Sequence, residues 1–331
     1  MQAVVIEEYG SPEVLQLKEI PNLEPCRGEV RVRVHASALN RADIEQRQGN
    51  YPPPTAAEHE IPGLEFAGVV DKLGPEVRQW SVGTRVFGLL SAGGYAEQVV
   101  THERMLMPIP PNLTFEQAAA IPEVFFTAYD ALIDKADFQA GDTVLIHAGA
   151  SGVGTATIQL ARVMGASLIL TTGRTNWKLD KCLQLGANQA VNTAEVEFDC
   201  FVLDATASKG VDIILDFIGA DYLEKNLGAA ALGGRIVQIA TLSGSSTQIN
   251  LQKVLSKRLR LQGTTLRSRA LEQKMTLTQT FTKQVLPLFA DGRLKPIIDC
   301  SFQLKDVVEA HRYMENNSNV GKIILTIGLE E

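Results

Sequence analysis

The chain has 331 residues, a formal net charge of −7 and a sequence pI of about 5.4. With 45% hydrophobic and 21% charged residues, it has the composition of a folded protein that is long enough for about two domains. The acidic balance argues against binding to nucleic acid or to anionic membranes, because both need a basic face.

The first 120 residues or so are typical of short strands separated by Gly and Pro turns. β-prone runs cover 3–6, 29–35, 66–73 and 83–88. We expect the first run to be a strand rather than a signal peptide, because no long apolar core follows it. Tyr51 precedes three prolines, and this stretch is predicted to be extended because each proline disfavours the helical region for the residue before it.

From about residue 124 the pattern changes to strands that alternate with helices, which is typical of a parallel sheet. A helix at 115–121 is predicted to end before Pro122. Strands are predicted at 143–148, 167–172, 211–217, 234–240 and 258–264. A long helix at 271–288 follows, and then β structure at 294–304, a helix at 307–314 and a strand at 322–327.

This order predicts an α/β protein with two domains. A doubly wound domain, residues 124–294, is inserted into a β-rich domain formed by residues 1–123 and 295–331. In such a protein we expect the ligand cleft between the domains, at the carboxyl ends of the parallel strands. No window reaches 18 apolar residues, so no membrane span is expected.

The most specific local feature is a glycine cluster after the strand at 143–148. Ser151, Gly152, Val153 and Gly154 open the next helix, so they predict a turn that holds a pyrophosphate with backbone N–H groups and the positive end of the helix dipole. The strict G-x-G-x-x-G spacing is not met, because Ser151 stands where the middle glycine belongs. A simple turn before a helix is the alternative interpretation.

The residues after the next strand predict which dinucleotide binds. NAD-binding proteins usually carry an acidic residue about 20 residues past the glycines. Here the strand ends in Gly173 and Arg174, and Lys178 follows. Positive charge at this place suits a 2′-phosphate, so the predicted cofactor is NADPH. The alternative for Arg174 is a solvated loop charge.

Motifs along the whole chain resemble one family. They are the runs 37–43, 47–51, 63–68, 118–123, 145–149 and 151–154. In this order and spacing they resemble the zinc-free quinone oxidoreductases of the medium-chain dehydrogenase/reductase superfamily, and the runs 255–258 and 266–269 are closest to the p53-inducible quinone oxidoreductases. The resemblance implies a GroES-like catalytic domain, a Rossmann domain, NADPH, quinone substrates, and a homodimer or a dimer of dimers.

The resemblance also implies roles for single residues. Tyr51, Asn40 and Asp43 would line the catalytic cleft, with Tyr51 beside the nicotinamide. Each role has an alternative. Tyr51 could simply pack over the prolines, and Asn40 and Asp43 could stabilise turns. Asp43 could also pair with Arg47 across one helical turn. Thr127 is expected at a helix start near the nicotinamide, with capping as its alternative role. Other expected cofactor contacts are Asn192 (where the family often has an aromatic residue), Phe217, Ala240, Thr241, Leu242, Leu266 and Asn317.

No metal site is expected. By the resemblance, zinc-dependent relatives carry Cys or His at the positions of Asn40 and Leu64, and this chain has no cysteine cluster. His59, in an acidic loop, and His147, in an apolar strand, are interpreted as structural. The four cysteines lie far apart in sequence and are typical of free thiols in a reducing compartment, so a cytoplasmic protein is expected.

Three functional hypotheses follow. Without a Lewis acid to stabilise an alkoxide, alcohol dehydrogenation is disfavoured, whereas a quinone is already electrophilic. The leading hypothesis is therefore metal-free reduction of quinones by NADPH. The first alternative is an alkenal or enoyl reductase that adds hydride to an activated C=C bond, with Tyr51 stabilising the enolate. The second is a cofactor-binding structural or RNA-binding protein, although the net charge of −7 disfavours RNA.

Overall fold

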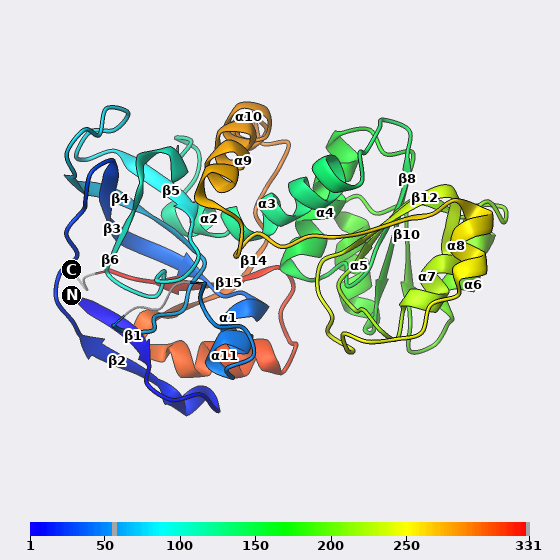
Figure 1. Cartoon of the computed structure of the whole chain (residues 1–331), viewed down its shortest axis with the longest axis horizontal. Coiled ribbons are helices and arrows are strands. Elements are labelled where there is room, and N and C mark those ends of the chain that lie inside the picture. Colours follow the sequence, from blue (N-terminus) through cyan, green and yellow to red (C-terminus); the bar gives the residue numbers. More distant parts are fainter. Residues whose placement is uncertain (55–57, 329–331) are drawn as a thin grey trace. The chain divides into compact units, whose positions relative to one another are not determined.

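The computed structural model describes residues 1–54 and 58–328, which form two compact units. The first unit holds Met1–Phe126 and Leu266–Glu331, and the second holds Thr127–Thr265 (Figure 1). A β-rich unit formed by both ends of the chain and an inserted doubly wound unit were expected, and this fold class is confirmed. The segment 266–294, which we expected in the inserted domain, groups with the first unit.

The first unit is built on a seven-stranded sheet. Its order is β14–β15–β3–β4–β5–β7, and β6 also pairs with β3. The strands are β3 (Glu29–Ala38), β4 (Glu65–Leu73), β5 (Arg85–Leu89), β6 (Gln98–His102), β7 (Leu106–Pro108), β14 (Ile298–Gln303) and β15 (Lys322–Thr326). Because β15 pairs with β3, the two ends of the chain share one sheet. A separate antiparallel pair consists of β1 (Gln2–Ile6) and β2 (Leu15–Glu19).

The helices of the first unit are short except for α9. They are α1 (Arg41–Arg47), α2 (Phe115–Ala119), α9 (Leu271–Gln284), α10 (Leu286–Ala290) and α11 (Val307–Glu315), with 3₁₀ turns η1 (Pro12–Val14), η2 (Glu103–Met105) and η4 (Leu304–Asp306). The single helix predicted for 271–288 is wrong. It splits into α9 and α10 because Pro287 lacks an N–H and its ring clashes with the carbonyl four residues earlier.

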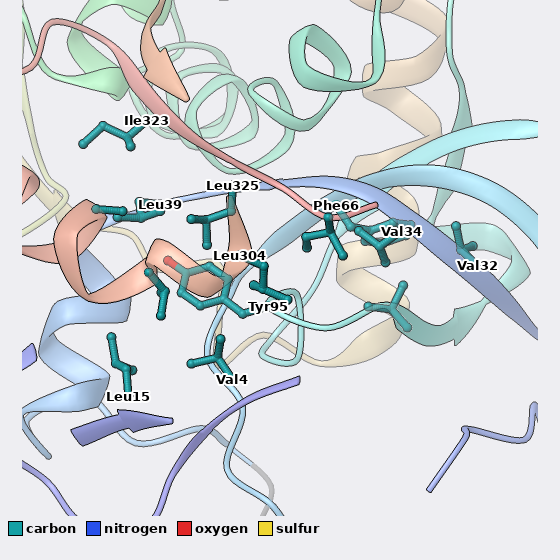
Figure 2. Close-up of a cluster of buried hydrophobic side chains, with 14 of the residues drawn as sticks. Val4, Leu15, Val32, Val34, Leu39, Phe66, Tyr95, Leu304, Ile323 and Leu325 are labelled. Atoms are coloured by element: carbon teal, nitrogen blue, oxygen red, sulfur yellow. The ribbon is translucent and has the colours of Figure 1, made fainter. Parts of the chain in front are cut away.

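The core of the first unit forms around this sheet. Val34, Phe66 and Leu325, from β3, β4 and β15, are each at most 2% exposed, and they belong to one buried cluster with Tyr95 (Figure 2). The alternating Val30, Val32 and Val34 of β3 are buried, as period-two strands require. Each such side chain contributes roughly 1.5–3 kcal/mol by its burial, so the core fixes the strand ends that carry the candidate site.

The second unit contains a fully parallel sheet of six strands. Its order is β10–β9–β8–β11–β12–β13, which is the arrangement of a dinucleotide-binding fold whose winding reverses between β8 and β11. The strands are β8 (Thr143–Ile146), β9 (Leu168–Gly173), β10 (Gln189–Asn192), β11 (Val211–Asp216), β12 (Ala230–Gln238) and β13 (Arg260–Gly263). Ile213, Ile214 and Leu215 are fully buried because helices cover both faces of the sheet.

Right-handed crossovers place these helices. Two of them, α4 (Gly152–Val163) and α5 (Asn176–Gln184), follow β8 and β9 and cover one face, while α6 (Phe198–Ala205), α7 (Leu223–Ala229) and α8 (Leu251–Lys257) lie on the other (Figure 1). The chain enters the unit through α3 (Pro122–Tyr129), which crosses the unit boundary, and the π-helix η3 (Asp130–Lys135). Within the described residues, no helix is long and apolar enough to cross a membrane.

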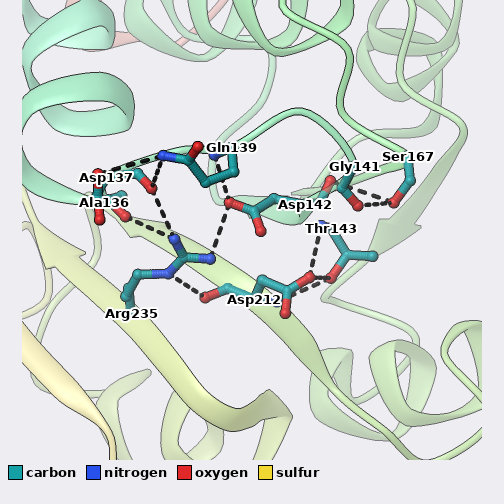
Figure 3. A network of polar contacts seen from close by, with 9 residues as sticks. All are labelled: Ala136, Asp137, Gln139, Gly141, Asp142, Thr143, Ser167, Asp212 and Arg235. Carbon is teal, nitrogen blue, oxygen red and sulfur yellow. Dashed lines mark hydrogen bonds and ion pairs between the residues drawn. The ribbon is translucent and has the colours of Figure 1, made fainter.

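A polar network holds the amino ends of the strands in the second unit (Figure 3). The Arg235 guanidinium lies 2.9 Å from Asp142 Oδ2 and donates to the carbonyl oxygens of Ala136 and Asp137 at 3.0 Å. Asp212 Oδ2 accepts from the N–H of Thr143 at 2.8 Å. These groups lie at the edge of the sheet opposite to the carboxyl ends, so we interpret them as structural.

Candidate active site

The residues predicted to bind a cofactor in the second unit gather at the carboxyl edge of its sheet. They follow or end five successive strands: residues 151–154 after β8, Gly173 and Arg174 at β9, Asn192 at β10, Phe217 after β11, and Ala240, Thr241 and Leu242 after β12. Open α/β sheets bind ligands at this edge, close to the reversal between β8 and β11. Local strand-and-turn signals therefore converge in space, although they are spread over 90 residues or so.

The turn after β8 is shaped as an anion cradle. Ser151 caps α4, since its Oγ accepts from the N–H of Gly154 at 3.0 Å. The other N–H groups of the first helical turn lack intrahelical partners, and they point along the positive end of the helix dipole. A pyrophosphate fits both features.

Two glycines let this turn close tightly against the sheet. A Cβ on Gly149 would lie 1.9 Å from Thr171 Oγ1, and one on Gly154 would lie 2.5 Å from the carbonyl oxygen of Ala148. Ala148 itself has φ +48°, a left-handed conformation that costs free energy in a residue with a Cβ. The packing of the turn thus demands glycine at both places, independently of any ligand.

The basic residues predicted to hold a 2′-phosphate lie at the end of β9 and on α5. Arg174 is exposed directly after β9, and the Lys178 ammonium lies 5.4 Å from the centre of the Trp177 ring. The register of β10 puts Asn192 opposite Gly173. Asn192 Nδ2 donates to Asn176 Oδ1 at 2.9 Å and to Glu195 Oε1 at 2.7 Å, so this side chain orders the rim of the site.

Buried polar groups support the turns after β8 and β11. Asp216 Oδ1 accepts from the N–H groups of Ile218 (2.6 Å) and Gly219 (3.1 Å), and burial raises the pKa of this carboxyl. His147 Nε2 lies 2.7 Å from Asn226 Oδ1, and its Nδ1 lies 3.0 Å from Thr172 Oγ1. Burial lowers the pKa of His147 to about 4, so the ring is neutral. The interpretation of His147 as a satisfied core residue is confirmed.

Three other predicted cofactor contacts lie elsewhere. Thr127 is buried in the second half of α3, so the expected place at a helix start is wrong. Leu266 is 6% exposed in the first unit. Asn317 follows α11 with φ +51°, and its Oδ1 accepts from Arg41 at 2.8 Å. Their roles toward a cofactor stay predictions.

The predicted catalytic Asn40 belongs to a buried charged cluster in the first unit. Asn40 Nδ2 donates to Glu65 Oε1 at 2.9 Å. The Lys322 ammonium donates to Asn40 Oδ1 and to the Leu39 carbonyl oxygen, both at 2.6 Å, and lies 2.7 Å from Glu65 Oε1. The Lys322 and Glu65 side chains are 3% and 0% exposed, so this ion pair is shielded from water and its geometry is tightly fixed.

The predicted catalytic Asp43 positions the neighbouring backbone. Its carboxylate accepts from the N–H of Asn40 (2.8 Å), the N–H of Gly63 (3.0 Å) and the Tyr95 hydroxyl (3.0 Å). Burial raises the pKa of Asp43 to about 6, although these hydrogen bonds oppose the shift. The alternative role of Asp43, a pair with Arg47 across one helical turn, is not found, because Arg47 pairs with Glu315.

The predicted catalytic Tyr51 is held by a buried arginine. The Arg267 guanidinium lies 4.8 Å from the centre of the Tyr51 ring, and its Nη1 donates to the Tyr51 carbonyl oxygen at 2.6 Å. Its Nε donates to the Ser91 carbonyl oxygen at 2.7 Å. Lys274 Nζ in turn donates to the Arg267 carbonyl oxygen at 2.7 Å. Since Arg267 is only 6% exposed, this network fixes the loop that carries Tyr51.

A mostly apolar cavity of about 280 Å³ opens beside this loop. Its walls come from the prolines after Tyr51, the end of β5, β6 and α9: Pro53, Pro54, Leu89, Leu90, Ser91, Ala92, Val100, Thr101, Met105, Leu271 and Lys274. Among the described residues that line it, Lys274 supplies the one charged group, and burial lowers the pKa of this amine. A flat apolar ligand with a polar oxygen suits such walls.

The comparisons with known proteins agree with this geometry. A model of the alcohol dehydrogenase GroES-like domain matches residues 26–111, and one of the zinc-binding dehydrogenases matches residues 152–289. A quinone oxidoreductase from Homo sapiens is 33% identical over 330 residues, which are 99% of this chain and 98% of that protein. The chain belongs to the medium-chain dehydrogenase/reductase superfamily.

Solved structures of this superfamily share the whole fold. The Escherichia coli quinone oxidoreductase complexed with NADPH has 29% identity and a TM-score of 0.89, with 99% of this chain and 100% of that chain covered. The JamJ enoyl reductase in its apo form has 28% identity and a TM-score of 0.89, with 99% of both chains covered. The resemblance to quinone oxidoreductases is thus confirmed, while the narrower p53-inducible branch stays a prediction.

Sequence reasoning missed some members of the cluster around Asn40. Glu65 was considered only within the motif 63–68 and as part of an acidic loop beside His59, Glu123 only within the motif 118–123, and Lys322 only as the start of a predicted strand. The one signal for Lys322 was a charged residue at the start of an otherwise apolar strand, which is costly unless the charge is paired.

Proposed function

We propose that this member of the superfamily reduces quinones with NADPH and without a metal. The observation that carries the proposal is the joint arrangement of a capped helix N-terminus after β8 and cations after β9, on a chain that is 33% identical to a quinone oxidoreductase. When bound, NADPH supplies a hydride. The chain's own residues bind the cofactor, orient the acceptor and provide protons.

The cofactor would lie along the carboxyl edge of the second sheet. Residues 151–154 would hold the pyrophosphate, and Gly173, Arg174 and Lys178 would hold the adenosine ribose with its 2′-phosphate. Asn192 would shape the adenine side. The segments after β11 and β12, with Phe217, Ala240, Thr241 and Leu242, would line the nicotinamide half. We propose that Thr127, Leu266 and Asn317 also contact the cofactor.

Replacing Arg174 and Lys178 with Ala tests the choice of cofactor. We expect the double variant to bind NADPH roughly 10- to 100-fold more weakly, because charged hydrogen bonds to a phosphate contribute about 1.5–3 kcal/mol each. Binding of NADH should change little, since NADH lacks the 2′-phosphate. Lys181→Ala, on the exposed side of α5, is the matched control. Equal losses for both cofactors would contradict the 2′-phosphate assignment.

The donor set around Asn40 does not suit zinc, although one matching family model is named for zinc-binding dehydrogenases. The Lys322 ammonium already contacts Asn40 Oδ1 and Glu65 Oε1. A zinc ion at these oxygens would therefore have to displace a buried ammonium group. Leu64, 1% exposed, offers no ligand atom. Among residues 1–54 and 58–328, no three His, Cys, Asp or Glu side chains form a metal-binding group.

The first unit would bind the acceptor beside Tyr51. The cavity next to this loop has apolar walls for a ring, and the Arg267 network keeps the loop closed against Ser91. The Tyr51 hydroxyl would donate a hydrogen bond to an acceptor oxygen. Exclusion of water by the apolar walls would strengthen that hydrogen bond.

Reduction of an activated C=C bond is the second candidate function. It is favoured by the close structural similarity to the JamJ enoyl reductase, at a TM-score of 0.89. Steady-state oxidation of NADPH with an ortho-quinone and with an alkenal, measured in parallel, separates the two. Faster turnover of the quinone supports the leading proposal, and alkenal turnover with an inert quinone replaces it. Binding of NADPH without either turnover would favour the non-enzymatic alternative.

We also propose that the protein is a cytoplasmic homodimer or dimer of dimers. All four residues of the edge strand β13 are exposed, and Leu232, Leu251 and Leu255 are each at least 64% exposed in the same unit. An open strand edge with neighbouring apolar side chains fits a second copy of the chain. Sedimentation that shows a monomer at micromolar concentration would contradict this proposal. No nucleic-acid or membrane partner is expected at a net charge of −7.

A further inference from the structure

Glu123 differs from the other residues of α3 in its exposure to solvent. Every residue of this helix is described, and Glu123 is the only one of them that is partly exposed. Its backbone is anchored, because its N–H donates to Glu65 Oε2 at 2.8 Å. The carboxyl group is therefore held at a rigid helix start, on a residue that is mostly but not fully buried.

The three neighbouring carboxyl groups differ in their hydrogen bonds. Asp43 accepts from two backbone N–H groups and the Tyr95 hydroxyl. Glu65 is paired with Lys322 and accepts from Asn40 and from the Glu123 N–H. The carboxyl of Glu123 accepts no hydrogen bond from any residue that the structure describes. Of the three groups, it is the one whose negative charge is least compensated.

Charges on several elements act on Glu123. Burial raises the pKa of its carboxyl to about 8, and Glu65 on β4 and Asp43 on α1 raise it too. Lys322 on β15 and Arg267, in the segment before α9, lower it. Lys274 on α9 also faces this group, because Glu123 raises the pKa of its amine. At neutral pH Glu123 therefore carries a proton, and its pKa lies in the range that suits a general acid.

Glu123 belongs to the same cluster as the proposed catalytic residues. Glu65 bridges Asn40 and the backbone of Glu123 through its two carboxylate oxygens. Arg267, which acts on Glu123, also stacks on Tyr51. Asp43 and Glu65 are both fully buried, whereas Glu123 is partly exposed.

We propose that Glu123 is a catalytic residue that gives a proton to the reduced substrate. This inference rests on the proposed function. Hydride addition leaves the acceptor as an anion with its charge on oxygen. The O–H bond of Glu123 then breaks, a new O–H bond forms on that oxygen, and water later returns a proton to the carboxylate. No further oxidant or reductant is needed.

The test compares E123Q, E123D and E116Q. Gln removes the proton donor but keeps the size of the side chain, Asp retains an acid, and the exposed Glu116 on α2 gives a matched control. The first readout is infrared difference spectroscopy of the protein without ligands, in which the C=O stretch of a protonated carboxyl is followed with pH. The second is the pH profile of kcat with the quinone.

We expect a protonated carboxyl band that is absent from E123Q and that disappears with a midpoint near pH 8 in the wild type. E123Q should lose about 10²-fold in kcat, at the lower end of what a positioned general acid contributes. The decrease in kcat that the wild type shows above about pH 8 should be absent from E123Q. E123D should retain part of the wild-type kcat, and E116Q should match the wild type.

Two outcomes would overturn the inference alone: a Glu123 that is ionised at pH 6.5 in the spectra, or an E123Q enzyme with wild-type kcat and pH profile. A wild-type enzyme that reduces neither quinone nor alkenal would instead refute the proposed function, and the inference with it.

Discussion

Replacing Lys322 with Met removes the cation at the centre of the buried cluster. Its Nζ donates to Leu39 and Asn40 at 2.6 Å and lies 2.7 Å from Glu65, and both side chains of the ion pair are at most 3% exposed. Truncating one partner of a buried pair leaves an uncompensated charge, which costs about 3–5 kcal/mol. We expect K322M to lower the free energy of unfolding of the first unit by this amount.

Two comparisons separate the buried charge from a general effect of losing lysine. Lys253 pairs with Glu224 on side chains that are 39% and 52% exposed, so K253M should cost less than about 1 kcal/mol. The double variant E65Q/K322M removes both charges of the buried pair. It should be more stable than K322M alone, because the carboxylate that lies closest to the lost ammonium is removed as well.

The two tryptophans allow the unfolding of each unit to be followed. Trp80 lies in the first unit and Trp177 in the second, where Trp177 is 50% exposed. In a W177F background, urea unfolding monitored by fluorescence therefore reports on the first unit. The reasoning is refuted if K322M unfolds within 1 kcal/mol of its parent (about the cost of an exposed pair), or if E65Q/K322M is no more stable than K322M.

Two shorter predictions concern the second unit and the metal. Gly149→Ala places a Cβ 1.9 Å from Thr171 Oγ1, so we expect a lower Tm and weaker cofactor binding. Gly228→Ala on α7, whose nearest neighbour would be 3.9 Å away, should leave both unchanged; equal losses in a cofactor titration would contradict the packing argument. Chelation with EDTA should leave quinone turnover unchanged, and loss of activity that zinc restores would refute the metal-free proposal.

Local sequence signals were sufficient for the architecture of the second unit. The run 212–218 is nearly continuous in apolar residues because its strand is covered by helices on both faces. The turn at 151–154 was found because a strand, a capping Ser and glycines occur together in a short stretch. Topology then brought the ends of five strands to one edge, so residues chosen for local reasons converge in space.

Local sequence signals could not predict which polar side chains pair with one another in the first unit. A pair between Arg47 and Asp43 is the natural local prediction, since these residues lie four apart on a helix. The structure instead joins Asp43 to Gly63 and Tyr95, and Arg47 to Glu315, over tens to hundreds of residues. Burial removes the competition of water, so the partner that is geometrically available prevails over the nearest residue in sequence.

The charges around Glu123 link the stability of this cluster to the proposed chemistry. Glu65 raises the pKa of Glu123, and Lys322 lowers it. K322M should therefore move the alkaline fall in kcat to higher pH, because the proton is held more tightly, and E65Q should move it to lower pH. Damage to the fold would reduce activity at every pH without opposite shifts. Shifts in the same direction in both variants would show that the titrating group is not Glu123.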